Sequence, residues 1–277
     1  MTEQELGSIL GFAVDAAKGA GAILRSAVDG TFSVSTKSTA TDMVTDVDTR
    51  AENYILGRIR KEFPGHGIVA EESGVSEAAN GAGTGAPGID AGTPYRWYVD
   101  PLDGTSNFVN GIPFFCTSIA LYREEEPLVG VVFDPMRGEC FAASAGGGAR
   151  RIDETGAVHR MGVSGAARLI ESIVSTGFPY DKHVNPDNNL REFAAVLPRV
   201  RGIRRFGSAA LDCAYVAAGR LDGSWEFGIS EWDIAAGRLL VTEAGGTVSR
   251  IPAPRDIHVF TNGRIHGELT GCVTAEE

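Results

Sequence analysis

The stretch Trp97-Tyr98-Val99-Asp100-Pro101-Leu102-Asp103-Gly104-Thr105-Ser106-Asn107-Phe108 places two carboxylates directly after an apolar run. We expect this run to be a strand that ends at Asp100, because Pro101 has no N–H group to donate to a sheet ladder. Asp103-Gly104 predicts a tight turn, and the small residues that follow can direct backbone N–H groups at an anion. Carboxylates beside such donors suit a hard cation that bridges to a phosphate.

The same pattern occurs in two other segments. Gly67-Ile68-Val69-Ala70 predicts a short strand that ends in Glu71 and Glu72. Further on, Glu231-Trp232-Asp233 opens a predicted helix, in which Asp233 is an N-cap or first-turn residue. Three distant segments therefore each end an element with a carboxylate. Oxygen ligands without a nearby His or Cys set favour Mg²⁺, Mn²⁺ or Ca²⁺ over Zn²⁺.

Composition predicts a soluble enzyme-sized unit. The 277 residues are 43% hydrophobic and carry a formal net charge of −11, with a pI near 5.0. This charge argues against general binding of nucleic acid or of an anionic membrane. The N-terminus lacks a basic segment before an apolar core, and we expect no run that approaches the roughly 20 residues of a membrane span. The four cysteines show no C-x-x-C spacing, which favours buried thiols in a reducing cytoplasm.

Hydrophobic periodicity predicts alternating helices and strands, which favours layered α/β packing. We expect one unit over residues 1–277, with approximate halves 1–150 and 151–277. A helix is predicted over residues 3–28, and a second from Thr49 to Phe63, where Thr49 and Glu52 have the spacing of a capping box. Residues 33–45 are expected to form a hairpin or loop, and Ser73 to Thr93 a long surface loop. Further strands are predicted at 116–121, 128–133, 139–143, 172–176, 202–206, 223–227, 247–250 and 258–261, and further helices at 189–197 and 208–218.

These motifs carry a resemblance. Asp100 to Phe108 resembles the signature of the inositol monophosphatase family, and Trp232-Asp233-Ile234-Ala235-Ala236-Gly237 resembles its second signature. Ala70-Glu71-Glu72-Ser73, Thr176 to Asp181 and Gly202 to Asp212 are also similar to the family, in the same order. The resemblance implies alternating layers of helices and sheets, of the kind shared with fructose-1,6-bisphosphatase, with the site between two halves.

The resemblance also implies a metal site and its reaction. It assigns one metal to Glu71, Asp100 and the Leu102 carbonyl, and a second to Asp100, Asp103 and Asp233, with two or three Mg²⁺ per site and Mn²⁺ as a substitute. The implied reaction is hydrolysis of a small phosphate monoester, myo-inositol 1-phosphate above all, by a water that Thr105, Asp48 and Glu71 help to activate. Li⁺ sensitivity and a homodimer are implied as well.

The remaining implied contacts are with the substrate. Phosphate would lie on the N–H groups of Gly104, Thr105 and Ser106, with Lys37 nearby. Glu226 and the backbone of Gly207, Ser208 and Ala209 would contact the ring hydroxyls, and Asp103 and Asp233 would lie beside the ester.

Several alternatives stay open at this stage. Asp48 alone is typical of a helix N-cap, and Glu226 of an exposed strand residue. Glu72 fits a solvated role or a role in supporting the neighbouring metal ligand. The cluster Arg199, Arg201, Arg204 and Arg205 fits a solvated face or subunit contact better than a substrate or RNA site. Rival functions are another phosphatase of the superfamily, for fructose 1,6-bisphosphate, histidinol phosphate or 3′-phosphoadenosine, and a non-catalytic interaction protein on the same scaffold. No serine has the context of a covalent nucleophile.

Overall fold

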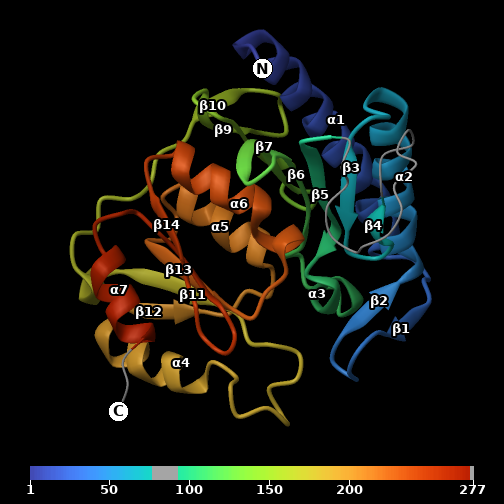
Figure 1. Cartoon of the computed structure of the whole chain (residues 1–277). Helices are drawn as coiled ribbons and strands as arrows, with labels where there is room; N and C mark the ends of the chain where they lie inside the picture. The colour runs from blue at the N-terminus through green and yellow to red at the C-terminus, as the bar shows by residue number, and fades with distance from the viewer. Residues whose placement is uncertain (77–92, 275–277) are drawn as a thin grey trace.

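The computed structural model describes residues 1–76 and 93–274, and it confirms the layered α/β fold. Five layers alternate across the molecule (Figure 1). Two N-terminal helices cover one face of a large sheet, a central helix pair lies between this sheet and a smaller one, and two further helices cover the outer face of the smaller sheet. Three clusters of buried apolar side chains fill the spaces between the layers.

The large sheet has eight strands in the order β10-β9-β8-β7-β6-β5-β3-β4. Neighbouring strands are antiparallel except β3 and β5, which run parallel, so that the two strand ends carrying Glu71 and Asp100 lie side by side. The strands are β3 (Gly67–Ala70), β4 (Gly74–Ser76), β5 (Tyr95–Asp103), β6 (Cys116–Arg123), β7 (Glu126–Asp134), β8 (Glu139–Ser144), β9 (Gly148–Ile152) and β10 (Val158–Arg160).

The small sheet has five strands in the order β12-β11-β13-β15-β14. β11 pairs in parallel with β12 and β13, and β15 pairs antiparallel with β13 and β14. The strands are β11 (Ile173–Thr176), β12 (Gly202–Arg204), β13 (Gly223–Phe227), β14 (Thr247–Ile251) and β15 (Ile257–Thr261). A separate hairpin, β1 (Val34–Thr36) with β2 (Met43–Thr45), matches the predicted hairpin.

The helices supply the other layers. The outer N-terminal pair is α1 (Glu3–Ala27) and α2 (Asp46–Glu62), the central pair is α5 (Ala209–Ala217) and α6 (Glu231–Glu243), and the opposite outer pair is α4 (Leu190–Val196) and α7 (His266–Val273). A short helix, α3 (Thr105–Val109), follows β5. The sequence analysis missed α3, α7 and strands β4, β9 and β10, which are three to eight residues long and so carry little periodicity.

Two predicted boundaries were wrong. The capping box of α2 is formed by Thr45 and Asp48, not by Thr49 and Glu52, so the helix begins three residues earlier. Strand β5 does not end at Asp100 but continues to Asp103 across an irregularity in its pairing with β6. Pro101 is tolerated there because bulges do not need its missing N–H group, and its carbonyl accepts a hydrogen bond from Thr117 Oγ1 at 3.0 Å.

Two further expectations need correction. The predicted loop from Ser73 includes strand β4, while residues 77–92 lie outside the described residues. Helix α1 is long and apolar enough to cross a membrane by length and composition, with a mean hydropathy of 1.3 over its best window. Half of that window is buried inside the protein, and a buried core helix passes the same test, so this supports a membrane span only weakly. Cys116, Cys140 and Cys213 are buried as predicted, and Cys272 is half-buried; all four are free.

The central helix pair depends on a close approach at Gly237. A Cβ atom placed there would lie 2.5 Å from Cys213 Cβ and 2.8 Å from Cys213 Sγ, so α6 packs against α5 at a distance only glycine permits. On α2, by contrast, a Cβ atom at exposed Gly57 would meet nothing within 4 Å.

We therefore predict opposite effects for two Gly→Ala substitutions. Gly237→Ala should lower the free energy of unfolding by about 1–3 kcal/mol through overpacking, whereas Gly57→Ala should raise it by about 0.5–1 kcal/mol through helix propensity. Urea unfolding of both variants measures this. A Gly237→Ala protein as stable as the wild type would show that the helices separate at no cost.

Candidate active site

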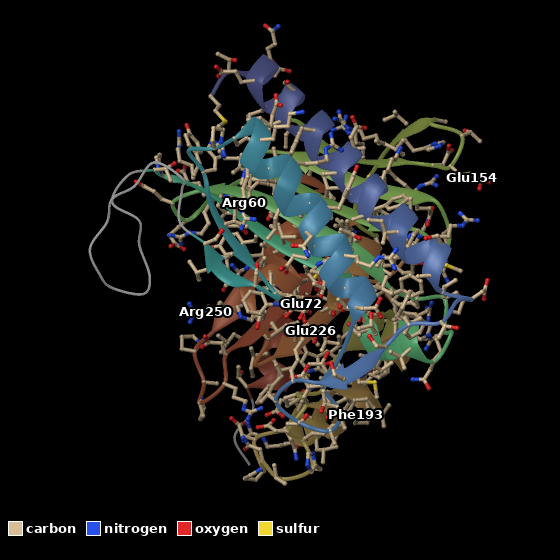
Figure 2. All side chains as sticks on the ribbon, turned by 90° about the vertical axis from the view of Figure 1, so that its right-hand side faces the viewer. Arg60, Glu72, Glu154, Phe193, Glu226 and Arg250 are labelled. Atoms are coloured by element: carbon tan, nitrogen blue, oxygen red, sulfur yellow. The ribbon has the colours of Figure 1, made fainter. Side chains whose placement is uncertain are left out.

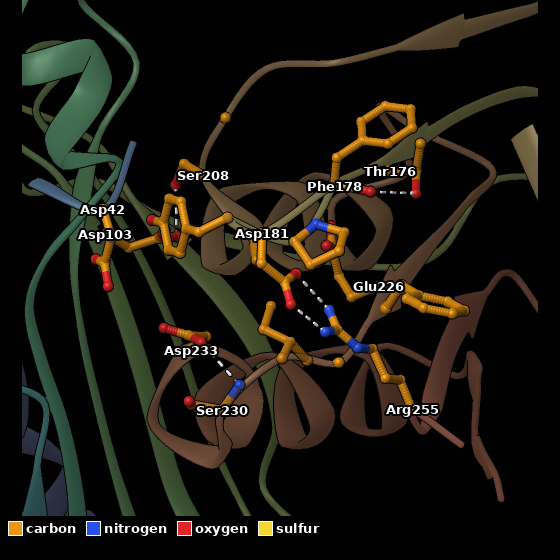
Figure 3. Close-up of a pocket in the computed structure, with 18 of the residues that line it drawn as sticks. Asp42, Asp103, Thr176, Phe178, Asp181, Ser208, Glu226, Ser230, Asp233 and Arg255 are labelled. Atoms are coloured by element: carbon orange, nitrogen blue, oxygen red, sulfur yellow. Dashed lines mark hydrogen bonds and ion pairs between the residues drawn. The ribbon is translucent and has the colours of Figure 1, made fainter. Parts of the chain in front are cut away.

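A cleft of about 620 Å³ lies where the two sheets meet the central helices. Its walls come from the β1–β2 hairpin, the ends of β3, β5, β11 and β13, and the first turns of α5 and α6 (Figure 3). The predicted site residues that line it are Lys37, Glu71, Asp103, Gly207, Ser208, Ala209, Glu226 and Asp233. Those that lie at its base or behind it are Asp48, Asp100, Leu102, Gly104, Thr105 and Ser106.

The end of β5 positions Asp100 at the base of the cleft. Asp100 is 1% exposed, and its Oδ1 accepts a hydrogen bond from Leu102 N at 3.0 Å. This bond bends the chain back at the point where the pairing with β6 is irregular. The Leu102 carbonyl oxygen in turn lies 3.0 Å from Thr105 Oγ1. The irregular strand end thus gathers three predicted site residues within one turn of chain.

Asp103 joins the large sheet to the central helices. Its Oδ2 accepts from Ser208 Oγ and from Ala210 N, each at 2.7 Å, so this carboxylate lies at the N-terminus of α5 (Figure 3). The positive end of a helix favours a negative charge there. Burial nevertheless raises the pKa of Asp103 to about 6, even though these bonds act in the opposite direction.

Asp233 is placed by the first turn of α6. Ser230 is the N-cap, and Ser230 N donates to Asp233 Oδ2 at 3.0 Å in a capping box (Figure 3). The sequence predicted Asp233 as either the N-cap or a first-turn residue of this helix, and the structure shows that it is a first-turn residue. The box fixes one oxygen of the carboxylate and turns the side chain toward the cleft.

Like charges meet at this point. Burial raises the pKa of Asp100 well above its ordinary value, and the neighbouring carboxylates of Glu71, Asp103 and Asp233 raise it further. The pKa of Asp233 is raised by burial and then by Glu71 and Asp103. Four carboxylates from three segments therefore lie close together, and the neighbouring charges disfavour the ionised forms of the three aspartates.

The donor set fits a hard divalent cation. Carboxylate oxygens and a backbone carbonyl are the ligands that Mg²⁺ and Mn²⁺ prefer, and a cation would relieve the repulsion that raises these pKa values. Within residues 1–76 and 93–274, no three His, Cys, Asp or Glu side chains already converge on one ion-sized point. Some of these side chains would have to rotate before their oxygens could bind one ion, because Glu71 is hydrogen-bonded to Lys37 and Asp103 to the N-terminus of α5.

Lys37 lies across the cleft from these aspartates. Its Nζ is 2.8 Å from Glu71 Oε1 and 2.5 Å from Glu72 Oε1. Burial alone would lower the pKa of Lys37, but the two carboxylates raise it. Burial raises the pKa of Glu72 to about 7. The contact makes Glu72 an ion-pair partner of Lys37 next to Glu71, which agrees with the second of its two predicted roles.

A polar relay lies behind the cleft. Thr105 Oγ1 is 3.1 Å from Asp48 Oδ1, and Asp48 is fully buried. The other oxygen of Asp48 accepts from Thr45 N at 2.9 Å and from Thr45 Oγ1 at 2.5 Å. Burial raises the pKa of Asp48 to about 6. Asp48 is therefore not the N-cap of α2, which is Thr45. It is the third residue of the helix and completes the capping box, and it also contacts Thr105.

Two glycines let the segments before α3 and α5 touch. Gly104 has a left-handed φ of 98°, and a Cβ atom there would lie 3.1 Å from the Phe114 carbonyl and 3.2 Å from the Gly207 carbonyl. Asn107 Nδ2 locks this contact by donating to the carbonyls of Phe114 and Phe206, each at 2.7 Å. Backbone of residues 207–209, which lines the cleft, therefore lies directly against the turn at Gly104.

Glu226 lies at the end of β13 and lines the cleft on the side away from Asp103 (Figure 3). It is 5% exposed, so it is not the exposed strand residue considered as an alternative. Burial raises its pKa to about 8, while Arg205 acts in the opposite direction. A Cβ atom at Gly177 would lie 2.4 Å from Glu226 Oε2, so a side chain at 177 would displace this carboxyl group.

Comparison with known proteins agrees with this geometry. The profile of the inositol monophosphatase family matches residues 5–271. The chain belongs to the inositol monophosphatase family. It is 45% identical to "Nus factor SuhB" of Pseudomonas aeruginosa over 96% of this chain and 93% of that protein. It is 40% identical to "Inositol-1-monophosphatase" of Synechocystis sp. over 98% and 90% of the two chains. The structure of inositol monophosphatase from Anabaena (Nostoc) sp. aligns with a TM-score of 0.81 at 38% identity, covering 97% and 96%.

The cleft of this inositol monophosphatase family member contains residues that the sequence analysis missed. Arg205 lines the cleft, whereas we expected it on a solvated face with the other three arginines. Asp212 is 1% exposed, and burial raises its pKa well above the ordinary value. Asp181 and Arg255 form an ion pair at the rim (Figure 3). Asp181 and Arg255 are 74 residues apart in the sequence, so no local pattern could have revealed this ion pair.

The repulsion around Asp100 leads to a prediction on stability. Asp100→Asn should raise the melting temperature of the metal-free protein by about 2–4 °C for each kcal/mol of repulsion removed, because asparagine keeps the bond from Leu102 N but loses the charge. Turnover should fall by orders of magnitude while the fold persists.

The matched control is Asp134→Asn on β7. Asp134 is fully buried, but it accepts from Met136 N and Arg137 N and pairs with Arg137. Loss of this charge should therefore lower the melting temperature. Thermal scans in EDTA compare the two variants, and a fall in both would show that the carboxylates at the cleft do not repel one another.

Proposed function

We propose that this protein is a Mg²⁺-dependent phosphomonoesterase, and that its substrate is a myo-inositol monophosphate such as myo-inositol 1-phosphate. One observation carries the proposal: a cleft that combines four repelling carboxylates at one end with a buried Glu226 at the other. The first feature suits a cation and a phosphate, and the second suits a polyhydroxylated alcohol. Family membership supports the phosphatase class, and the relatives named inositol-1-monophosphatase support the substrate.

Glu71, Asp100, Asp103, Asp233 and the Leu102 carbonyl would hold the metal. Bound there, Mg²⁺ or Mn²⁺ would neutralise phosphate charge, lower the pKa of a coordinated water and stabilise the leaving alkoxide. The protein's own contribution is to bring these five oxygen donors together from β3, β5 and α6, which the parallel pairing of β3 with β5 makes possible.

Thr105 and Asp48 would orient the attacking water. The Thr105 hydroxyl donates to Asp48 Oδ1 and can accept a hydrogen bond from a water on its open side. With a pKa of about 6, Asp48 is mostly ionised at pH 7.5 and is close to the value that suits a general base. The relay can therefore receive the proton of the water as its oxygen attacks phosphorus. N–H groups of residues 104–106 border the position of the phosphate, and Lys37 supplies a positive charge nearby.

Glu226 would bind the alcohol. At pH 7.5 a carboxyl group with a pKa of about 8 is largely protonated, so it can both donate to one ring hydroxyl and accept from another. Backbone of residues 207–209 also lines the cleft, next to Asp103. We extend the proposal to a cytoplasmic homodimer, which rests on the family resemblance.

A substrate panel with a Glu226 variant tests the assignment. The wild type should release phosphate from myo-inositol 1-phosphate in Mg²⁺ faster than from fructose 1,6-bisphosphate, histidinol phosphate or 3′-phosphoadenosine 5′-phosphate, and should be inactive in EDTA. Glu226→Gln should reduce kcat/KM for inositol phosphate by at least about tenfold more than for an aryl phosphate, which has no ring hydroxyls to bind. Glu243→Gln, whose carboxylate binds the turn at 146–148, is the control. Equal losses on both substrates would remove Glu226 from the alcohol site.

Asp233 leads to a prediction about cations. It comes from α6, whereas the other ligands come from the large sheet, so we expect it to complete the weaker of two metal sites. Activity should rise over the millimolar range of Mg²⁺, and Li⁺ should inhibit. Asp233→Asn should weaken both effects in steady-state assays. Li⁺ inhibition that is unaltered in an Asp233→Asn enzyme with residual activity would contradict this placement.

A further inference from the structure

Helix α2 presents two buried carboxylates on one face. Asp48 and Glu52 are four residues apart, one turn along the helix, and they are 0% and 3% exposed. Asp48 contacts Thr105, as described above. Glu52 points to a different part of the site and has no role in the proposed reaction so far.

Glu52 binds the turn that follows β3. Its Oε2 accepts from Glu72 N at 2.8 Å, and its Oε1 accepts from Ser73 N at 3.0 Å. Figure 2 shows Glu72 beside α2. Both oxygens of the carboxylate are therefore committed to consecutive backbone N–H groups. Within the part of the chain that the structure describes, no lysine or arginine pairs with Glu52.

The turn needs this support. Glu71 N still donates to the Val99 carbonyl at 3.1 Å, in line with β5, but β4 begins at Gly74 and pairs back onto Ala70. Glu72 N and Ser73 N lie in the reversal between the two strands, and without Glu52 the half-buried Glu72 N would lose its partner, whereas Ser73 is exposed and could turn to water. An unpaired buried N–H group costs about 1–3 kcal/mol.

The choice of a carboxylate is unfavourable on charge alone. Asp48, Glu71 and Glu72 are already nearby, and a further buried negative charge without a cation is destabilising. Two charge-assisted hydrogen bonds to backbone offset that cost. They also fix the direction in which the Glu71 side chain leaves the turn, because Glu71 directly precedes the two bound N–H groups.

We infer that Glu52 is a positioning residue that acts through Glu71. Its carboxylate holds the 71–73 turn so that Glu71 faces Asp100, and Asp48 on the same helix face holds Thr105. Because both carboxylates belong to one rigid helix, α2 sets the distance between Glu71, a proposed metal ligand, and Thr105, which is proposed to orient the attacking water. The inference rests on the proposed function for its kinetic consequences, but not for the local structure that it assigns.

Hydrogen exchange of the metal-free protein tests the local contact. In Glu52→Gln the amide nitrogen must face one of the two N–H groups, so the amides of Glu72 and Ser73 should exchange at least about tenfold faster, while those of β7 stay as in the wild type. Glu52→Asp keeps the charge but is too short to reach both N–H groups, and should behave in the same way. Glu62→Gln, at the exposed end of the same helix, is the matched control.

Metal binding tests the consequence. Calorimetric titration with Mn²⁺ should show an affinity reduced by about 10–100-fold in both Glu52 variants, the range expected for partners that orient metal ligands. The half-activating Mg²⁺ concentration should rise in parallel, with KM for the phosphate ester unchanged. If the protein hydrolyses no monoester, the proposed function fails, yet exchange and Mn²⁺ binding still decide the role of Glu52.

Three outcomes would overturn the inference. They are wild-type exchange at Glu72 and Ser73 in Glu52→Gln, wild-type Mn²⁺ affinity despite faster exchange, and a Glu52→Asp protein that matches the wild type in both measurements. If Glu52→Gln does not fold, the Glu52→Asp comparison alone carries the test, and a general rise in exchange that includes β7 counts against a positioning role.

Discussion

Repulsion among buried carboxylates is the constraint on which the rest of this structure depends. Glu71, Asp100, Asp103 and Asp233 come from three distant segments. Burial raises the pKa values of the three aspartates, and the neighbouring carboxylates raise them further. The protein offsets this repulsion with fixed donors: Leu102 N for Asp100, Ser208 and Ala210 for Asp103, and Ser230 N for Asp233. A cation at this site, as proposed, would relieve the repulsion that these donors leave.

The layered fold supplies these donors. Helices α5 and α6 lie between the two sheets with their first turns at the cleft, so the positive ends of both helices face the acidic end of β5. Close packing at Gly237 keeps the two helices together, and Gly104 lets the β5 turn approach the segment before α5. Helix α2 closes the arrangement from the other side of the large sheet through Asp48 and Glu52. The first turns of α2, α5 and α6 therefore take part both in the packing of the layers and in the placement of the side chains at the cleft.

Local sequence predicted those features that local physics determines. A strand that ends before a carboxylate is visible in Ala70-Glu71, and the layered class follows from alternating periodicity, whereas β5 continues past Asp100 to Asp103. Other features depend on distant partners. Thr45 caps α2 because the hairpin places it there, although Thr49 has equally good spacing. Glu52 looks like a capping residue in sequence, but its true partners are 20 and 21 residues away. Likewise, Arg205 borders the cleft only because β12 leads directly into α5.

Diffraction from crystals grown with Mn²⁺ and phosphate tests the central claim most directly. The account predicts anomalous peaks about 2.1–2.2 Å from carboxylate oxygens of Glu71, Asp100, Asp103 and Asp233, with Lys37 moved off Glu71 and phosphate oxygens completing the coordination. Anomalous peaks elsewhere on the protein, or a cleft in which Lys37 still pairs with Glu71 at saturating Mn²⁺, would contradict it.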